Sequence, residues 1–283
     1  MVLFDNMGSV TLYTVLVVTA LLTYGVAGNP FAAALDFLKN LVLSPKHFIH
    51  FVAVLAILFL NKNEMRFERN IDFSANFTHL FKSIEGNFVA NLQHTFENST
   101  LTTGLVFIYV VCLQALLVSS IILYTYRSKS KQMYYATCYA IMINYLVAIP
   151  FYLFFPINEV WSYDPNVRFL MLEAFPKFET EYRPLSGLNN CFPSLHTSIS
   201  TTLAILAVKS GNKKWAVLVC TCAALTIFSI FYLGIHWLID MCGGLVLATF
   251  ASVVGLKLAK LNLLRLPEQL PSRLFARARE EVK

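Results

Sequence analysis

Residues 215–257 read WAVLVCTCAALTIFSIFYLGIHWLIDMCGGLVLATFASVVGLK and contain only two charged side chains, Asp240 and Lys257. The segment divides into two apolar stretches, 215–234 and 237–257. About 20 apolar residues are enough for a helix to cross the hydrocarbon core of a bilayer. The segment therefore predicts two consecutive membrane-spanning helices, and it sets the expected class of the whole protein.

The rest of the chain has the same character. Of its 283 residues, 57% are hydrophobic and 13% are charged, whereas a soluble domain carries roughly 25% charged residues. Such a chain has too little polar surface to enclose one core in water. Five further apolar stretches predict spans, the second and the last being shorter than usual: 9–27, 47–61, 104–125, 133–155 and 195–209. The expected fold is an all-α, polytopic membrane helical bundle of six or seven transmembrane helices.

The basic residues predict how this bundle is oriented. Fifteen of the 22 Lys and Arg residues fall on one side of the predicted spans, which is also the side of the C-terminus. The positive-inside rule makes that side cytoplasmic, so the connections 62–103 and 156–193 face outward from a cell membrane. The net charge of +6 comes from short stretches between apolar runs. It therefore indicates contact with lipid headgroups and not with nucleic acid.

Three regions follow from the predicted order. Residues 1–132 hold the N-terminal spans, 133–260 form a helical core with the candidate catalytic residues, and 261–283 form a basic cytoplasmic tail. Within 62–103, apolar residues recur at nearly helical spacing, which fits a helix lying in the membrane interface. A folded outer loop is an equally good interpretation of that segment. The six cysteines show no disulfide framework.

Asp240 is the only carboxylate within the opening segment. A charged side chain at membrane depth costs roughly 2.5–3.5 kcal/mol on insertion scales, so its presence needs a reason. His236 precedes it by four residues, which places both side chains on one face of a helix. The carboxylate can hold the imidazole in one tautomer and stabilise its cation. The two residues are either a catalytic pair at the outer membrane boundary or a structural polar pair between helices.

A second polar cluster leads into the apolar stretch 195–209. Residues 183–197 read RPLSGLNNCFPSLHT. Pro193 and Ser194 are typical of a helix start, where first-turn amides and the helix dipole favour an anion. His196 lies in the same turn, and Arg183 is a bidentate donor for phosphate. The span order places this cluster on the outer face with His236, so together they predict one phosphate-handling site.

These motifs resemble those of the type 2 phosphatidic acid phosphatase superfamily, whose pattern is K-x6-R-P, then P-S-G-H, then S-R-x5-H-x3-D. The three parts match, in order, Arg183-Pro184, Pro193-Ser194-x-His196, and Ser229 with His236 and Asp240. The resemblance covers about residues 177–244. It implies a membrane enzyme without metal or cofactor that acts on a lipid phosphate such as a phosphatidate-like or polyprenyl phosphate or diphosphate.

The resemblance also implies a role for each matched residue. His236 would be the nucleophile that forms a phosphohistidine, with Asp240 orienting its ring. His196 would protonate the leaving oxygen and then activate the acceptor. Arg183, Ser194 and Lys177 would bind the phosphate oxygens.

Three positions depart from the family pattern. Lys177 lies one residue too close to Arg183, Leu195 replaces the glycine of the second part, and Ile230 replaces the arginine of the third. Lys177, Arg168, or the amides of Asn189 and Asn190 are the candidates to replace the missing cation. The form Pro-Ser-Leu-His-Thr is similar to that of the inositol phosphorylceramide synthase branch, which moves a phospho-headgroup between lipids. Lipid phosphotransfer is therefore the alternative to hydrolysis.

Two further functions fit some of the same residues. His196, His236 and Asp240 are ligand types found in zinc hydrolases. Intramembrane His and Asp residues also serve proton relays, which would suit a transporter or scramblase. Against transport, the polar residues lie at predicted helix ends on one face, and the two halves of the sequence show no matching broken helices.

Overall fold

The computed structural model describes residues 2–26, 28–68, 76–126 and 131–261. Within these ranges the regular structure is helical, and the one β-type pairing is an isolated bridge between Ile157 and Asn190. The elements in chain order are α1 (Met7–Val26), α2 (Pro30–Leu43), α3 (Pro45–Glu68), α4 (Thr78–Glu85), α5 (Phe88–Phe96), α6 (Ser99–Phe107), the π-helical turn η1 (Ile108–Cys112), α7 (Leu113–Tyr126), α8 (Gln132–Phe154), α9 (Val160–Tyr163), the 3-10 turn η2 (Leu170–Glu173), the π-helical turn η3 (Phe178–Tyr182), α10 (Arg183–Ser186), α11 (Leu195–Lys209), α12 (Lys213–Tyr232) and α13 (Leu238–Leu261).

Five helical segments of the described chain are long and apolar enough to cross a membrane: α1, the continuous Ser99–Tyr126 segment, α8, α12 and α13. The number rises to six if α2 and α3, which are bent by 103° at their junction, form one span. α11 is helical as predicted, but its 15 residues are fewer than a span usually needs. The predicted all-α membrane bundle is therefore confirmed, with five or six candidate spans, and the chain is an integral membrane protein.

Large apolar side chains cover the outside of several of these helices. Leu35 is 66% exposed, Val217 is 67% exposed and Val246 is 72% exposed. Extended apolar surface of this kind is unfavourable in water and suits the hydrocarbon of a bilayer. The apolar side chains of the protein thus lie partly in a buried core and partly on a surface that suits contact with lipid.

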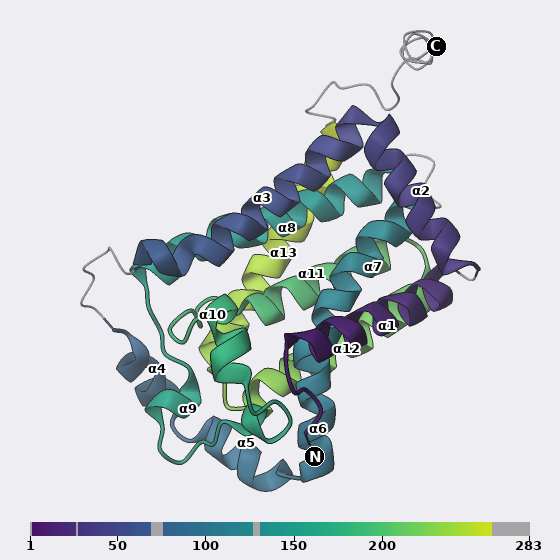
Figure 1. Cartoon of the computed structure of the whole chain (residues 1–283). Helices are drawn as coiled ribbons and strands as arrows, with labels where there is room; N and C mark the ends of the chain where they lie inside the picture. Colours follow the sequence, from purple (N-terminus) through teal and green to yellow (C-terminus); the bar gives the residue numbers. More distant parts are fainter. Residues whose placement is uncertain (1, 27, 69–75, 127–130, 262–283) are drawn as a thin grey trace, which may run out of the picture.

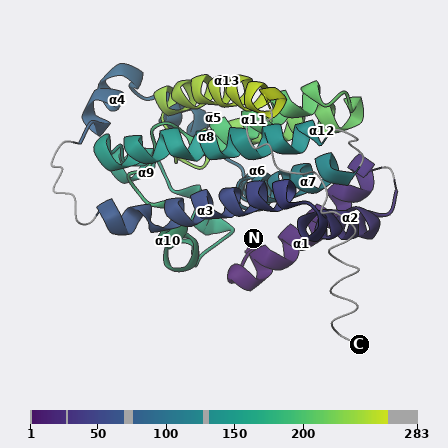
Figure 2. The same ribbon diagram turned by 90° about the horizontal axis from the view of Figure 1, so that it is seen from above.

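The long helices pack in layers. In the view from above, α8 lies between α13 and α3 and contacts both (Figure 2), and α11 contacts both α8 and α13. The approach of α13 to α8 depends on a small residue, because a Cβ atom on Gly255 would lie 2.8 Å from the carbonyl oxygen of Ala136. Small residues allow such close backbone contact between membrane helices.

The short helices α4, α9 and α10 lie at the end of the bundle away from the bend between α2 and α3 (Figure 1). The predicted outer segment 62–103 comprises the end of α3, then α4, α5 and the start of α6, while residues 69–75 lie outside the described residues. Gln93 on α5 donates to the carbonyl oxygen of Tyr232 over 2.9 Å, which ties this segment to the end of α12. Of the predicted tail 261–283, only Leu261 is described.

Candidate active site

His236 lies in the tight turn that joins α12 to α13. The amides of Ile235 and His236 donate to the carbonyl oxygen of Ile230 over 3.0 and 3.1 Å, which closes the end of α12. The turn needs a glycine at 234, because its φ is +80° and a Cβ there would lie 2.7 Å from the carbonyl oxygen of Arg168. Val160 and Trp161 also donate their amides to this turn. The backbone that carries His236 is therefore fixed on several sides.

The predicted His236–Asp240 pair is formed. Nδ1 of His236 lies 3.3 Å from Oδ2 of Asp240, and the Trp237 amide donates to the same oxygen over 2.8 Å. Asp240 is fully buried and His236 is 4% exposed. An imidazole whose Nδ1 faces a buried carboxylate presents Nε2 to its other side. The pair has the arrangement that orients a histidine for attack or for proton transfer.

His196 stands beside this pair. Its ring centroid lies 6.2 Å from that of His236, and its other neighbour is Tyr109, stacked on it at 3.9 Å with 17° between the rings. Tyr109 belongs to η1, the π-helical turn inside the Ser99–Tyr126 span. Such turns interrupt an α-helix and are frequent at functional sites. The two histidine rings are thus held close together, with Tyr109 packed on His196.

The two sequence motifs are joined through the backbone. The Ser194 amide donates to the carbonyl oxygen of Asp240 over 3.1 Å, so the start of α11 is tied to the first turn of α13. Ser194 is the N-cap of α11 and its hydroxyl accepts from the Thr197 amide over 3.3 Å. A Cβ atom on Gly244 would lie 2.7 Å from the Ser194 carbonyl oxygen, so a glycine is needed where the helices meet.

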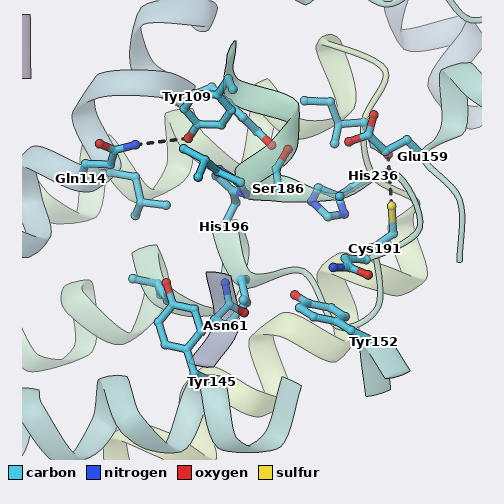
Figure 3. A pocket seen from close by; sticks show the side chains of 18 of the residues that line it. Asn61, Tyr109, Gln114, Tyr145, Tyr152, Glu159, Ser186, Cys191, His196 and His236 are labelled. Carbon is cyan, nitrogen blue, oxygen red and sulfur yellow. Dashed lines mark hydrogen bonds between the residues drawn. The ribbon is translucent and has the colours of Figure 1, made fainter. Parts of the chain in front are cut away.

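A cavity of about 260 Å³ is open to both histidines (Figure 3). Its polar lining consists of four tyrosines, three side-chain amides, one serine and two carboxylates: Tyr109, Tyr145, Tyr152, Tyr182, Asn61, Gln114, Asn190, Ser186, Glu64 and Glu159. Cys191 also lines it. Among the described residues, no Lys or Arg side chain belongs to this lining.

Arg183, which was predicted to donate hydrogen bonds to the phosphate, lies behind the cavity wall. It donates to Glu159 over 2.6 Å, to Glu179 over 2.9 Å and to the Gly187 carbonyl oxygen over 2.9 Å. Burial raises the pKa of the Glu159 carboxyl, and the Arg183 guanidinium opposes that shift. The structure therefore brings Arg183 close to the site through Glu159 and does not point it into the cavity.

Burial also raises the pKa of the Cys191 thiol, and the charges of Asp240 and Glu159 raise it further.

The remaining predicted phosphate ligands are more dispersed. The Ser194 hydroxyl caps its own helix and does not line the cavity, and Lys177 is exposed away from it. Arg168 pairs with Glu97 and Glu173 at the surface. Of the candidates to replace the missing cation, Asn190 is the one that lines the cavity, where its side-chain amide donates to Glu64 over 2.9 Å.

The described residues include one cluster of potential metal ligands, and it differs from the set predicted from sequence. Cys191, His236 and Asp240 have ligand atoms within 4.8 Å of one another. His196, which the zinc-hydrolase interpretation required, is not part of this group. The ligand set that sequence suggested for a metallohydrolase is thus not assembled.

Sequence reasoning missed several residues that shape the site. Tyr109 is hidden in an apolar run, and Asn61 and Glu64 come from α3, far from the motifs in the chain. Glu85 was also missed: its two carboxylate oxygens accept the amides of Leu238 and Ile239, each over 2.7 Å, at the start of α13. Among these residues, a sequence signal could have pointed to a carboxylate such as Glu159, which stands alone between apolar residues of a loop.

Glu85 predicts a stability effect that can be measured without any assay of function. Replacing a side chain that caps a helix typically costs about 1 kcal/mol, so Glu85→Ala should lower the midpoint of thermal unfolding in detergent. Glu173→Ala is the matched control, because Glu173 is partly exposed and pairs with an exposed arginine, a contact that contributes little. Equal midpoints for both variants would contradict the capping role of Glu85.

Comparison with known proteins gives one family. A family profile described as the PAP2 superfamily matches residues 75–254, which is more than half of the chain and contains both histidines and Asp240. No curated protein and no solved structure gave a match.

Proposed function

Since the chain belongs to the PAP2 superfamily, we propose that it is a membrane phosphatase that hydrolyses a lipid-linked phosphate or diphosphate through a phosphohistidine on His236. The family match supports phosphatase or phosphotransferase chemistry without metal. The observation that carries the proposal is the pair of histidines on one cavity, with a buried carboxylate behind one of them. We expect this site to face away from the cytoplasm, as the basic residues predict.

In the proposed first step, Nε2 of His236 attacks phosphorus while its Nδ1 hydrogen remains bonded to Asp240. The bond between phosphorus and the lipid oxygen breaks, and His196 gives its proton to that oxygen. In the second step, His196 takes a proton from water, the water oxygen attacks phosphorus and the phosphorus–nitrogen bond breaks. Arg183 would add positive charge behind Glu159, while the first turn of α11 supplies the helix dipole.

The lining of the cavity favours a second candidate, the transfer of a phospho-headgroup between lipids. A phosphate group alone would need cations around it, but the lining has tyrosine hydroxyls, amides and carboxylates. These are groups that accept from and donate to the hydroxyls of a polar headgroup. The cavity of about 260 Å³ also has room for more than a phosphate. In this alternative, a lipid hydroxyl takes the place of water in the second step.

The two candidates predict different products. Purified protein in detergent or nanodiscs should be given phosphatidate, a polyprenyl diphosphate, and a phosphodiester lipid with and without an acceptor lipid that carries a hydroxyl group. A phosphatase releases inorganic phosphate without any acceptor, whereas a transferase forms a new phospholipid only when the acceptor is present. Activity should persist in excess chelator. Loss of turnover with chelator, or no reaction with any donor, would contradict the proposal.

A further inference from the structure

Cys191, His236 and Asp240 form a compact group on one side of the cavity. One ligand atom of each residue lies within 4.8 Å of the other two, and Figure 3 shows Cys191 next to His236. Cys191 is 2% exposed and Asp240 is fully buried. The thiol makes only a long contact, 3.8 Å, with the carbonyl oxygen of Ile235. The thiol lies next to the candidate nucleophile but has no role in the proposed phosphoryl transfer.

Asp240 adds an independent observation. Its Oδ2 is occupied by the His236 ring and the Trp237 amide, whereas its buried Oδ1 has no hydrogen-bond partner among the described residues. A buried carboxylate oxygen without a partner carries a large desolvation cost, which a cation can offset. Glu159 also lines the cavity and contributes to the negative surroundings of the Cys191 thiol.

We infer that Cys191, His236 and Asp240 form a binding site for a thiophilic divalent ion such as Zn²⁺ or Cd²⁺, and that the bound ion inhibits the enzyme. Sulfur, imidazole nitrogen and carboxylate oxygen are the ligands that zinc uses. Zinc bonds of about 2.0–2.3 Å place tetrahedral ligand atoms roughly 3.5 Å apart, so small side-chain rotations close the site. Two of the three ligands, Cys191 and His236, line the cavity.

Inhibition follows from the identity of the ligands. An ion bound at Nε2 of His236 takes the lone pair that attacks phosphorus in the proposed first step. An ion bound at Nδ1 replaces the hydrogen bond to Asp240 and moves the ring hydrogen to Nε2, which then has no lone pair for attack. Binding releases the Cys191 proton to solvent and involves no change of oxidation state. Mg²⁺ and Ca²⁺ prefer oxygen ligands and should not bind here. The inhibition rests on the proposed role of His236, whereas the binding does not.

Binding is tested first, in a Cys220→Ser, Cys242→Ser background that lacks the exposed thiols. Cd²⁺ should produce the ultraviolet absorption of a cadmium–thiolate bond, with one equivalent bound, and Zn²⁺ should displace it. Loss of an outer-sphere partner already weakens metal binding roughly 10- to 100-fold, so Cys191→Ser should weaken it by about 100-fold or more. Cys222→Ser is the matched control and should keep the binding. If Cys191→Ser fails to fold, His236→Asn should lose it equally.

Inhibition is tested next, with each variant normalised to its own metal-free turnover. Zn²⁺ should inhibit the background protein and the Cys222→Ser control alike, Mg²⁺ should not inhibit either, and Cys191→Ser should need about 100-fold more Zn²⁺. Unchanged Cd²⁺ absorption in Cys191→Ser, or no absorption in the background protein, would overturn the site. Binding that depends on Cys191 but leaves turnover intact would keep the site and overturn the role of His236 as nucleophile.

Discussion

Replacing His236 by Asn should remove turnover to the limit of detection. A nucleophile that acts together with an acid and a base cannot be replaced by water, and losses of about 10⁶-fold are seen when such a residue is removed from a catalytic unit. Asn keeps much of the shape and polarity of the ring edge but cannot accept the phosphoryl group. The measurement is turnover of the best lipid phosphate, with the folded state checked by thermal unfolding in detergent.

A trapping experiment separates this role from a structural one. Wild-type protein quenched during turnover of a ³²P-labelled lipid phosphate should carry label that is stable in base and released by acid, as expected for a phosphohistidine. The His236→Asn protein should carry none. His94→Asn is the matched control, because His94 is exposed on α5 away from the cavity, and it should keep both label and turnover. Full turnover of folded His236→Asn protein would end the proposed mechanism.

The second large effect is expected at His196, and it should depend on the leaving group. General acid–base catalysis contributes about 10²- to 10⁴-fold, so His196→Ala should lose that much turnover on a lipid phosphate, whose alkoxide needs a proton to leave. A nitrophenyl phosphate ester loses its nitrophenolate without a proton. With that ester, His196→Ala should show a rapid burst of nitrophenolate followed by slow turnover, because the histidine is still missing from the second step.

The same variant should accumulate the phosphohistidine that the wild-type protein hydrolyses quickly, and burst size and label should agree. His79→Ala is the control, since His79 is exposed on α4, and it should behave like the wild type with both substrates. An equal loss with both leaving groups and no accumulated label would show that His196 is not the acid and base of the reaction.

The long apolar runs allowed most of the spans to be predicted from sequence. α1, α8, α12 and α13 lie within a few residues of the predicted stretches, because their apolar composition directly requires burial or lipid contact. α2 was not predicted, because Asp36 and Lys39 interrupt its apolar residues. The N-cap Asn29 and Pro30 are the signal that marks its start.

The candidate site was only partly predictable. The four-residue spacing of His236 and Asp240 predicted their contact, although His236 lies in the turn before α13 and not on the helix itself. The start of α11 follows from Pro193 and Ser194. The contact of Arg183 with Glu159 could not be inferred, because it depends on the folding of the 155–194 connection, whereas Glu179 precedes Arg183 by only four residues. Tyr109 was equally hidden, since an apolar run carries no sign of a π-helical turn.

Asn61 and Glu64 on α3 line the same cavity as the histidines, yet α3 precedes the residues 75–254 that the family profile matches. Under the proposed function, the reacting groups and part of the surface that would meet the substrate come from separate stretches of one chain. Substitutions in α3 can alter the preference for one lipid over another without displacing His236, His196 or Asp240. The division lets selectivity diverge during evolution while the chemistry is retained.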